Sequence, residues 1–135
     1  MPIVVDSSAL VAMLLGEPEA DLILTAVLQA EECWISAFNL LETEIVIAAK
    51  KGEAGRATLD ALVHHLGLQT IPLTAEHVQL ALEGWLRFGK GRHPAALNLG
   101  DCCAYALARA SGSALLAKGA DFPQTDVQLV EFPQP

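Results

Sequence analysis

Residues 3–10 read IVVDSSAL, and this stretch sets the class of fold. Three consecutive β-branched residues predict a short buried strand. Asp6 and the two serines behind it predict the start of a helix, because Asp and Ser are good N-caps. A strand that passes directly into a helix is typical of parallel α/β sheets, in which ligands bind beyond the carboxyl ends of the strands. Asp6 therefore stands where such a domain holds its ligand.

The rest of the chain repeats this alternation. Strand-like apolar runs lie at residues 3–5, 33–35, 68–73, 114–117 and 127–130, and helical patterns lie at residues 8–15, 19–30, 37–51, 53–66, 75–88 and 99–110. Short strands that alternate with helices predict a parallel sheet covered by helices on both faces. We expect one α/β domain over residues 1–135.

The composition narrows the class of protein further. Apolar residues make up 53% of the 135 residues, so the chain can build a real core and disorder is excluded. No apolar run approaches the roughly 20 residues of a membrane span, and we see no secretory signal, so we expect a cytoplasmic protein. The odd count of three cysteines also suits reduced thiols. Sixteen acids against eight basic residues give a net charge of −8, which counts against general capture of a polyanion.

Four carboxylates occupy positions where a fold favours apolar side chains. Asp6 and Asp121 follow apolar strand-like runs, while Glu42 and Asp101 fall on the apolar stripes of their helices. For Glu42 the predicted stripe consists of Phe38, Leu41, Ile45, Val46 and Ala49. Burying an unpaired carboxylate is energetically unfavourable, so four of them need a partner, and a divalent cation is the simplest one. We expect them to converge at one edge of the sheet.

Each carboxylate also has an ordinary structural explanation. Asp6 can be a simple helix cap, Glu42 can reach water from the rim of its helix, and Asp101 can interact with the positive end of the helix dipole. Asp121 sits in a turn, where aspartate is common, and Asp126 competes with it for the fourth acidic position. The functional interpretation depends on all four lying together.

The type of ligand narrows the choice of metal. Carboxylates without a chelating pattern of His and Cys favour a hard cation, Mg²⁺ or Mn²⁺, over Zn²⁺. Cys102 and Cys103 are adjacent, point about 100° apart on a helix, and are expected to pack in the core. No glycine-rich phosphate loop and no Ser-His-Asp pattern occurs in the sequence.

The order and the surroundings of these acids resemble those of the PIN-domain proteins of the VapC type, the toxins of bacterial type II toxin–antitoxin pairs. The resemblance covers nearly the whole chain and is carried by residues 4–10, 36–42, 88–94, 97–102 and 115–122. It implies a PIN-like three-layer sandwich and an endoribonuclease that hydrolyses RNA phosphodiesters with water activated by Mg²⁺ or Mn²⁺.

The resemblance also implies roles for single residues. Asp6 and Asp101 match the principal metal ligands, Glu42 matches the acid that completes the site, and Asp121 matches the last acid. Ser8 matches a hydroxyl that supports the site. All four acids are expected to be catalytic.

The chain departs from the family pattern before the last acid. Ala120 stands where family members commonly carry asparagine, so the turn that aims Asp121 is expected to be looser. This departure keeps a second hypothesis open, a non-catalytic PIN-like binding module with a decayed site. A phosphatase of similar build is a third, although Ser8 replaces the second acid of its Asp-x-Asp pattern.

The expected binding partners of the chain are inferred partly from its charge and partly from the resemblance. Arg87, Lys90 and Arg92 form a basic strip that we expect to guide an RNA backbone, with a solvated loop as the alternative. The resemblance implies a homodimer and a cognate VapB-like antitoxin that covers the active site. Apolar residues within 10–15 and 22–28 are candidates for either contact, although most of them are expected in the core.

Overall fold

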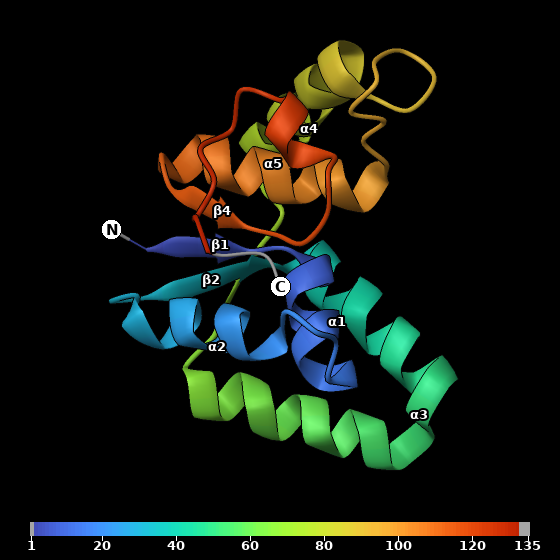
Figure 1. The fold of residues 1–135 in the computed structure, drawn as a ribbon. Helices are drawn as coiled ribbons and strands as arrows, with labels where there is room; N and C mark the ends of the chain where they lie inside the picture. The colour runs from blue at the N-terminus through green and yellow to red at the C-terminus, as the bar shows by residue number, and fades with distance from the viewer. Residues whose placement is uncertain (1, 133–135) are drawn as a thin grey trace.

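The computed structural model describes residues 2–132 and contains a four-stranded parallel sheet with helices on both faces (Figure 1). The strands are β1 (Ile3–Val5), β2 (Cys33–Ser36), β3 (Gln69–Ile71) and β4 (Ala114–Leu116), in the spatial order β3-β2-β1-β4. The helices are α1 (Ser7–Leu15), α2 (Ala20–Gln29), α3 (Ala37–Leu66), α4 (Ala75–Phe88) and α5 (Leu99–Ser111), followed by a 3-10 helix at Phe122–Gln124. The predicted α/β fold with a parallel sheet is confirmed.

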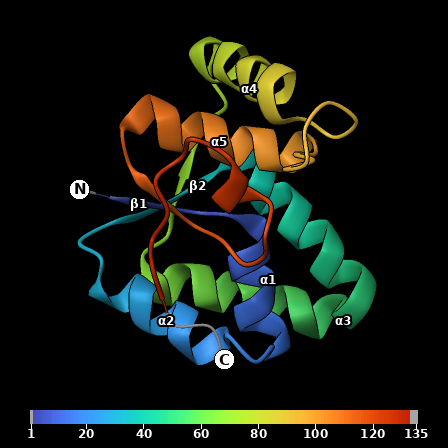
Figure 2. The ribbon, with the colours of Figure 1, turned by 45° about the horizontal axis from the view of Figure 1, so that its top comes forward.

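The helices divide into two layers around the sheet. Helices α1, α2 and α3 cover one face, and α5 covers the other with α4 packed outside it (Figures 1 and 2). The strand β1 supplies both cores, because successive side chains of a strand point to opposite faces. Val4 packs in the core that contains Tyr105, whereas Val5 packs in the core that contains Leu10. The arrangement is the expected three-layer sandwich.

One element confirms the predicted pattern and one differs from it. Helix α3 is bent at Gly52, whose φ of 62° and ψ of −151° interrupt the helix between the two helices predicted at residues 37–51 and 53–66. The apolar run at residues 127–130 does not form a fifth strand. It contacts the sheet through a single bridge between Leu129 and Leu115, so the prediction of a strand there was wrong. Polar contacts of Asp126, described below, hold the start of this run against α4 and α5.

The connections after β1 and β4 bring distant parts of the sequence to one edge of the sheet. Asp6 follows the end of β1, and its backbone N–H donates a hydrogen bond to the Leu116 carbonyl at the end of β4 (2.9 Å). Helix α3 starts directly after β2, and α5 begins at the same edge. This edge holds the candidate site. Within residues 2–132, no helix combines the length and the apolar character that a membrane crossing requires.

Candidate active site

Asp6 is a buried member of the site and also the N-cap of α1. Its Oδ2 atom accepts hydrogen bonds from the Ser8 backbone N–H (3.0 Å) and the Ser8 hydroxyl (2.6 Å). Its Oδ1 atom is buried and has no hydrogen-bond partner among the described residues. Burial raises the pKa of Asp6 to about 6; the Ser8 bonds oppose the rise, and the nearby Asp101 and Glu42 carboxylates add to it. Capping therefore uses one oxygen and leaves the other without a partner.

The buried stripe of α3 is not the one that the apolar pattern predicts. Leu41 and Ile45 are 55% and 61% exposed, whereas Asn39, Thr43 and Ile47 are buried. The polar pair can be buried because it is hydrogen-bonded: the Thr43 hydroxyl donates to the Asn39 carbonyl (2.8 Å), and the Asn39 side chain bonds to other elements. Glu42 is therefore placed beside a partly polar stripe and not within an apolar one.

The Glu42 carboxylate is held between α1 and α5. The Ser7 hydroxyl donates a hydrogen bond to Glu42 Oε1 (2.6 Å), and the backbone of Gly100 lies against the same carboxylate. A Cβ atom at Gly100 would stand 2.5 Å from both Glu42 oxygens. Glycine at position 100 therefore leaves the space that the carboxylate occupies.

Asp101 forms a capping box at the start of α5. Its backbone N–H donates to the Asn98 side chain (2.8 Å), and its carboxylate accepts from the Asn98 backbone N–H (3.1 Å). Burial raises the pKa of Asp101; the Asn98 N–H opposes the rise, and the charges of Asp121 and Glu42 increase it. The mutual influence of these carboxylates shows that the fold brings the four predicted acids into one electrostatic neighbourhood.

Asp121 is the exposed member of this group. It precedes the 3-10 helix and makes no capping hydrogen bond with its side chain. The turn before it is tethered at Lys118, whose backbone N–H donates to the Ser8 hydroxyl oxygen (3.0 Å). The Lys118 ammonium pairs with Glu17 (2.9 Å) and Glu19 (3.5 Å). These contacts fix the chain three residues before Asp121, although Ala120 offers no side-chain amide.

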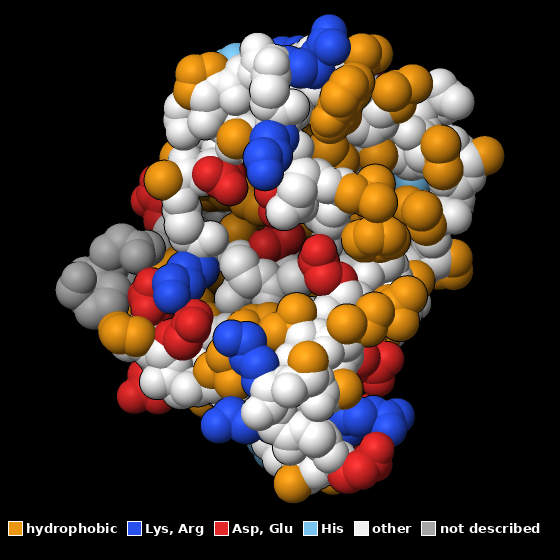
Figure 3. Space-filling model, turned by 90° about the vertical axis from the view of Figure 1, so that its right-hand side faces the viewer, with side chains coloured by type: hydrophobic (Ala, Val, Ile, Leu, Met, Phe, Trp, Pro, Cys, Tyr) orange, Lys and Arg blue, Asp and Glu red, His pale blue; other side chains and the backbone are white. Residues whose placement is uncertain are grey.

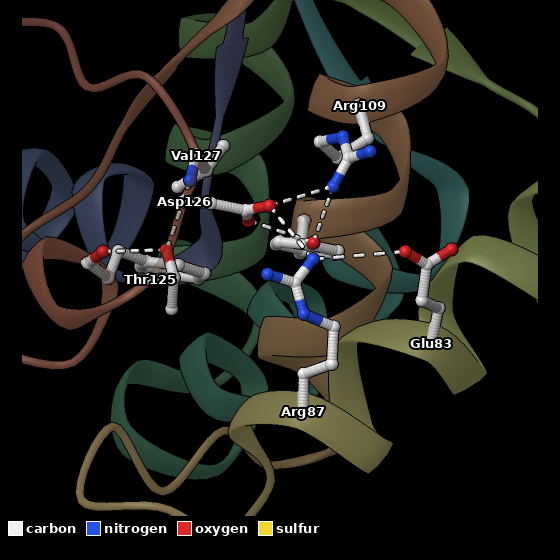
Figure 4. A network of polar contacts seen from close by, with 8 residues as sticks. Glu83, Arg87, Arg109, Thr125, Asp126 and Val127 are labelled. Carbon is white, nitrogen blue, oxygen red and sulfur yellow. Dashed lines mark hydrogen bonds and ion pairs between the residues drawn. The ribbon is translucent and has the colours of Figure 1, made fainter.

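Asp126 lies in a network of polar contacts with arginine side chains of α4 and α5 (Figure 4). Its carboxylate accepts hydrogen bonds from the Tyr105 hydroxyl (2.9 Å), Arg109 (3.0 Å) and Arg87 (3.0 Å), and Arg87 also faces Glu83. Partial burial opposes ionisation of Asp126, but the bonds from Tyr105 and Arg87 and the arginine charges outweigh it and lower the pKa. Asp126 therefore anchors the C-terminal segment to α4 and α5.

The predicted basic strip is divided among different contacts. Arg87 belongs to the network just described. The Arg92 guanidinium lies 4.9 Å from the centre of the Trp85 ring and donates a hydrogen bond to the Leu86 carbonyl (3.1 Å). Lys90 is exposed in the loop after α4. The strip is therefore not one continuous row of available cations.

The carboxylates suit a hard cation by their chemistry. Asp6, Glu42 and Asp101 offer only oxygen atoms, and Asp6 Oδ1 is a buried acceptor without a partner in residues 2–132. As the side chains stand, no group of three Asp, Glu, His or Cys residues in the described chain is spaced to ligate one ion. Cys102 and Cys103 are buried free thiols, as expected. Figure 3 looks onto this side of the molecule and shows acidic side chains around a hollow, with apolar side chains gathered to the upper right.

Sequence patterns did not indicate two of the residues that hold the site, Ser7 and Asn39. The signal for Ser7 was its place beside Asp6. The signal for Asn39 was its spacing of three residues from Glu42, which puts both on neighbouring positions of one helix. Both were hidden because their partners are distant in sequence.

The fold and the site define an α/β protein with an acidic centre beyond the carboxyl ends of a parallel sheet. The model of the PIN domain family matches residues 3–128. The chain is 42% identical over 130 residues to a protein named ribonuclease VapC30 from Mycobacterium tuberculosis, covering 96% of this chain and 99% of the relative. It is 44% identical over 127 residues to ribonuclease VapC from Mycolicibacterium smegmatis, covering 94% and 98%.

Solved structures agree with this match in fold. VapC20 of M. tuberculosis, described as a toxin that cleaves the sarcin–ricin loop, superposes with a TM-score of 0.76 at 18% identity and covers 95% of this chain and 98% of its own. A toxin–antitoxin complex from Klebsiella pneumoniae contains a chain with a TM-score of 0.69, also at 18% identity, with 95% and 96% covered. This chain belongs to the PIN-domain family, and within it to the VapC ribonucleases.

Proposed function

We propose that this chain is a metal-dependent endoribonuclease and the toxin of a type II toxin–antitoxin pair. The observation that carries the proposal is the buried Asp6 carboxylate, which has one oxygen without a hydrogen-bond partner among the described residues and interacts with the charges of Glu42 and Asp101. Unpaired burial of this kind is tolerated when a cation is bound. The names of relatives at 42% and 44% identity support RNA as the substrate.

Asp6, Glu42 and Asp101 would hold Mg²⁺ or Mn²⁺. When bound, the cation lowers the pKa of water and stabilises the negative charge that develops on the phosphate. Ser8 orients Asp6, and Ser7 orients Glu42, so both carboxylates keep fixed positions during the reaction. Glu42 or Asp121 would position the attacking water or accept its proton.

Cleavage mapping on total RNA tests this proposal. We expect the wild type to cut RNA in the presence of Mn²⁺, and Asp6→Asn to be inactive, while Asp60→Asn, an exposed control on α3, cuts as the wild type does. Identical cleavage by wild type and Asp6→Asn would refute the mechanism. A wild type that neither binds Mn²⁺ nor cuts RNA would favour the non-catalytic module, and hydrolysis of a generic phosphate ester alone would favour the phosphatase.

We propose that Lys90 and Arg92 guide the RNA backbone, whereas Arg87 contributes less because Asp126 and Glu83 already pair with it. The double replacement Lys90→Ala/Arg92→Ala is expected to weaken RNA binding and to flatten its dependence on salt concentration. Arg87→Ala is the matched control and is expected to change the salt dependence less. An equal effect of both changes would contradict this division of roles.

A homodimer is the assembly we propose, formed through an apolar surface centred on α4. This α4 patch consists of Leu73, Val78, Leu82, Trp85, Leu86 and Leu99, each between 40% and 66% exposed. In contrast, Leu28 is the large apolar residue of the ranges 10–15 and 22–28 that is exposed. Val78, Leu82 and Trp85 follow one another at helical spacing, so two copies can pack this face against itself about a two-fold axis.

The mass of the chain in solution tests the homodimer. Leu82→Glu is expected to give a monomer, and Leu28→Glu, a change at a similarly exposed leucine of α2, is expected to leave the dimer intact. A monomeric wild type at micromolar concentration would refute it. We further propose that the cognate antitoxin covers the acidic site and that the chain works in the cytoplasm, where its three free thiols stay reduced.

A further inference from the structure

Asn39 joins the three helices that carry the site. It lies in α3, is completely buried, and stands three residues before Glu42. Its side-chain nitrogen donates one hydrogen bond to the Ser7 hydroxyl oxygen in α1 (3.1 Å) and another to the Gly100 carbonyl in α5 (2.9 Å). Both hydrogens of the amide are therefore used to hold elements that are distant in sequence.

Asn39, Ser7 and Glu42 form a chain of hydrogen bonds in which Asn39 donates to Ser7 and Ser7 donates to Glu42. The Gly100 carbonyl can only accept, so the nitrogen of the Asn39 amide and not its oxygen must face it. The Ser7 oxygen accepts from that nitrogen, and the single Ser7 proton then points to Glu42 Oε1 at 2.6 Å. The backbone carbonyl of Asn39, at 3.2 Å, is the longer alternative. Asn39 thereby holds the Ser7 oxygen in place, and the short contact to the charged carboxylate favours donation of the Ser7 proton to Glu42.

Stability alone does not explain an asparagine at this position. Its Oδ1 atom is buried and has no hydrogen-bond partner among the described residues. An unpaired buried acceptor destabilises a fold and offsets part of the stability that the two hydrogen bonds of the amide nitrogen contribute. The amide donors of Asn39 therefore have a role beyond filling the core.

We propose that Asn39 is a positioning residue that fixes the Glu42 carboxylate through Ser7 and holds the first turn of α5, with Asp101, against α3. The inference rests on the proposed function, since it concerns the geometry of the same acidic site. Asn39 does not touch the substrate. It aligns two of the carboxylates that bind the cation and so acts on the reaction through them.

The replacement Asn39→Leu removes both donors and keeps the number of side-chain heavy atoms and the branch at Cγ. We expect kcat for RNA cleavage to fall by about 10- to 100-fold with KM within about twofold, because RNA contacts the exposed surface and not Asn39. Mn²⁺ binding, measured by titration without RNA, is expected to weaken by about tenfold. Thr43→Val is the matched control, since Thr43 is equally buried in α3 but donates only within that helix. It is expected to keep wild-type kcat and Mn²⁺ affinity.

A variant that is less stable but keeps wild-type kcat and Mn²⁺ affinity in its folded fraction would overturn the proposal. A double-mutant cycle with Ser7→Ala tests whether Asn39 acts on Glu42 through Ser7. If Asn39 acts on Glu42 through Ser7, the two changes are not additive in kcat, and full additivity would refute that route. Asn39→Ala, which also removes both donors and adds no bulk, carries the test should Asn39→Leu fail to fold. The Mn²⁺ titration separates this inference from the proposed function, because it does not depend on cleavage of RNA.

Discussion

The charge of Asp6 should destabilise the metal-free protein, and Asp6→Asn should relieve that destabilisation. Burial raises the pKa of Asp6 from 3.8 to about 6. At about 1.4 kcal/mol for each unit, this shift corresponds to about 3 kcal/mol of unfavourable free energy when the carboxylate is ionised in the folded state. Asparagine has the same shape, keeps an oxygen that can accept the Ser8 bonds, and carries no charge.

The sign of the effect depends on pH. A carboxylate whose pKa is raised in the folded state contributes stability below its unfolded pKa of 3.8 and loses that contribution as the pH rises through about 6. The variant should therefore be about 3 kcal/mol more stable than wild type at pH 8, and nearly equal to it at pH 3.5. Urea unfolding in EDTA at both pH values measures this difference, and Asp60→Asn serves as the control at an exposed carboxylate.

Bound metal should make the wild type more stable than Asp6→Asn, the reverse of their order in EDTA. Saturating Mn²⁺ binds the folded wild type and stabilises it, whereas the variant has lost a ligand and gains little. The reasoning would be refuted by a variant no more stable than wild type at pH 8 in EDTA. It would also be refuted by an advantage of the same size at pH 3.5, which would show that charge is not its origin.

Three further changes probe the surroundings of the site. Gly100→Ala should displace the Glu42 carboxylate and reduce cleavage at least tenfold. The free energy of unfolding in urea should change by no more than about 1 kcal/mol, because the carboxylate can swing aside and alanine favours a helix. Undiminished cleavage would contradict the placement of Glu42 against Gly100. Lys118→Met removes the ion pairs with Glu17 and Glu19 and should loosen the turn before Asp121 and reduce cleavage severalfold. Activity equal to wild type would show that these ion pairs do not hold the turn in its active position. The lowered pKa of Asp126 contributes stability above the unfolded pKa that is lost as the pH falls. Asp126→Asn should therefore be less stable than wild type at pH 7 by about 1 kcal/mol or less, with the gap closing towards pH 3, and a gap that persists at pH 3 would point to a cause other than charge.

The fold could be predicted where the signal is local. The β-branched run at residues 3–5 is a strand, and the helix that begins at Ala75 is capped by Thr74, because these signals act within a few residues. The run at residues 127–130 has the same apolar character but pairs through only one residue. Its position depends on contacts with α4 and α5 that are distant in sequence. Local patterns carry no information about such contacts.

The candidate site could also be predicted only in part. The acids could be identified because a carboxylate at an apolar position is conspicuous in any sequence. The stripe of α3 was misplaced because the prediction treated burial as a property of apolar side chains. Asn39 and Thr43 are buried through hydrogen bonds, while Leu41 and Ile45 face outward. A buried polar residue is visible only when its partners are known.

The order in which the chain is synthesised gives the sheet topology a consequence for the cell. The backbone N–H of Asp6 donates a hydrogen bond to the Leu116 carbonyl, so the first acid of the site is secured by β4, the last of the four strands in chain order. Asp121 comes later still. A growing chain that stops before β4 has its first three acids but lacks the strand that flanks β1 and the turn that carries the fourth. For a protein proposed to cut RNA, this delay would keep the ribosome and messenger that produce it out of reach of a competent site until synthesis is nearly complete.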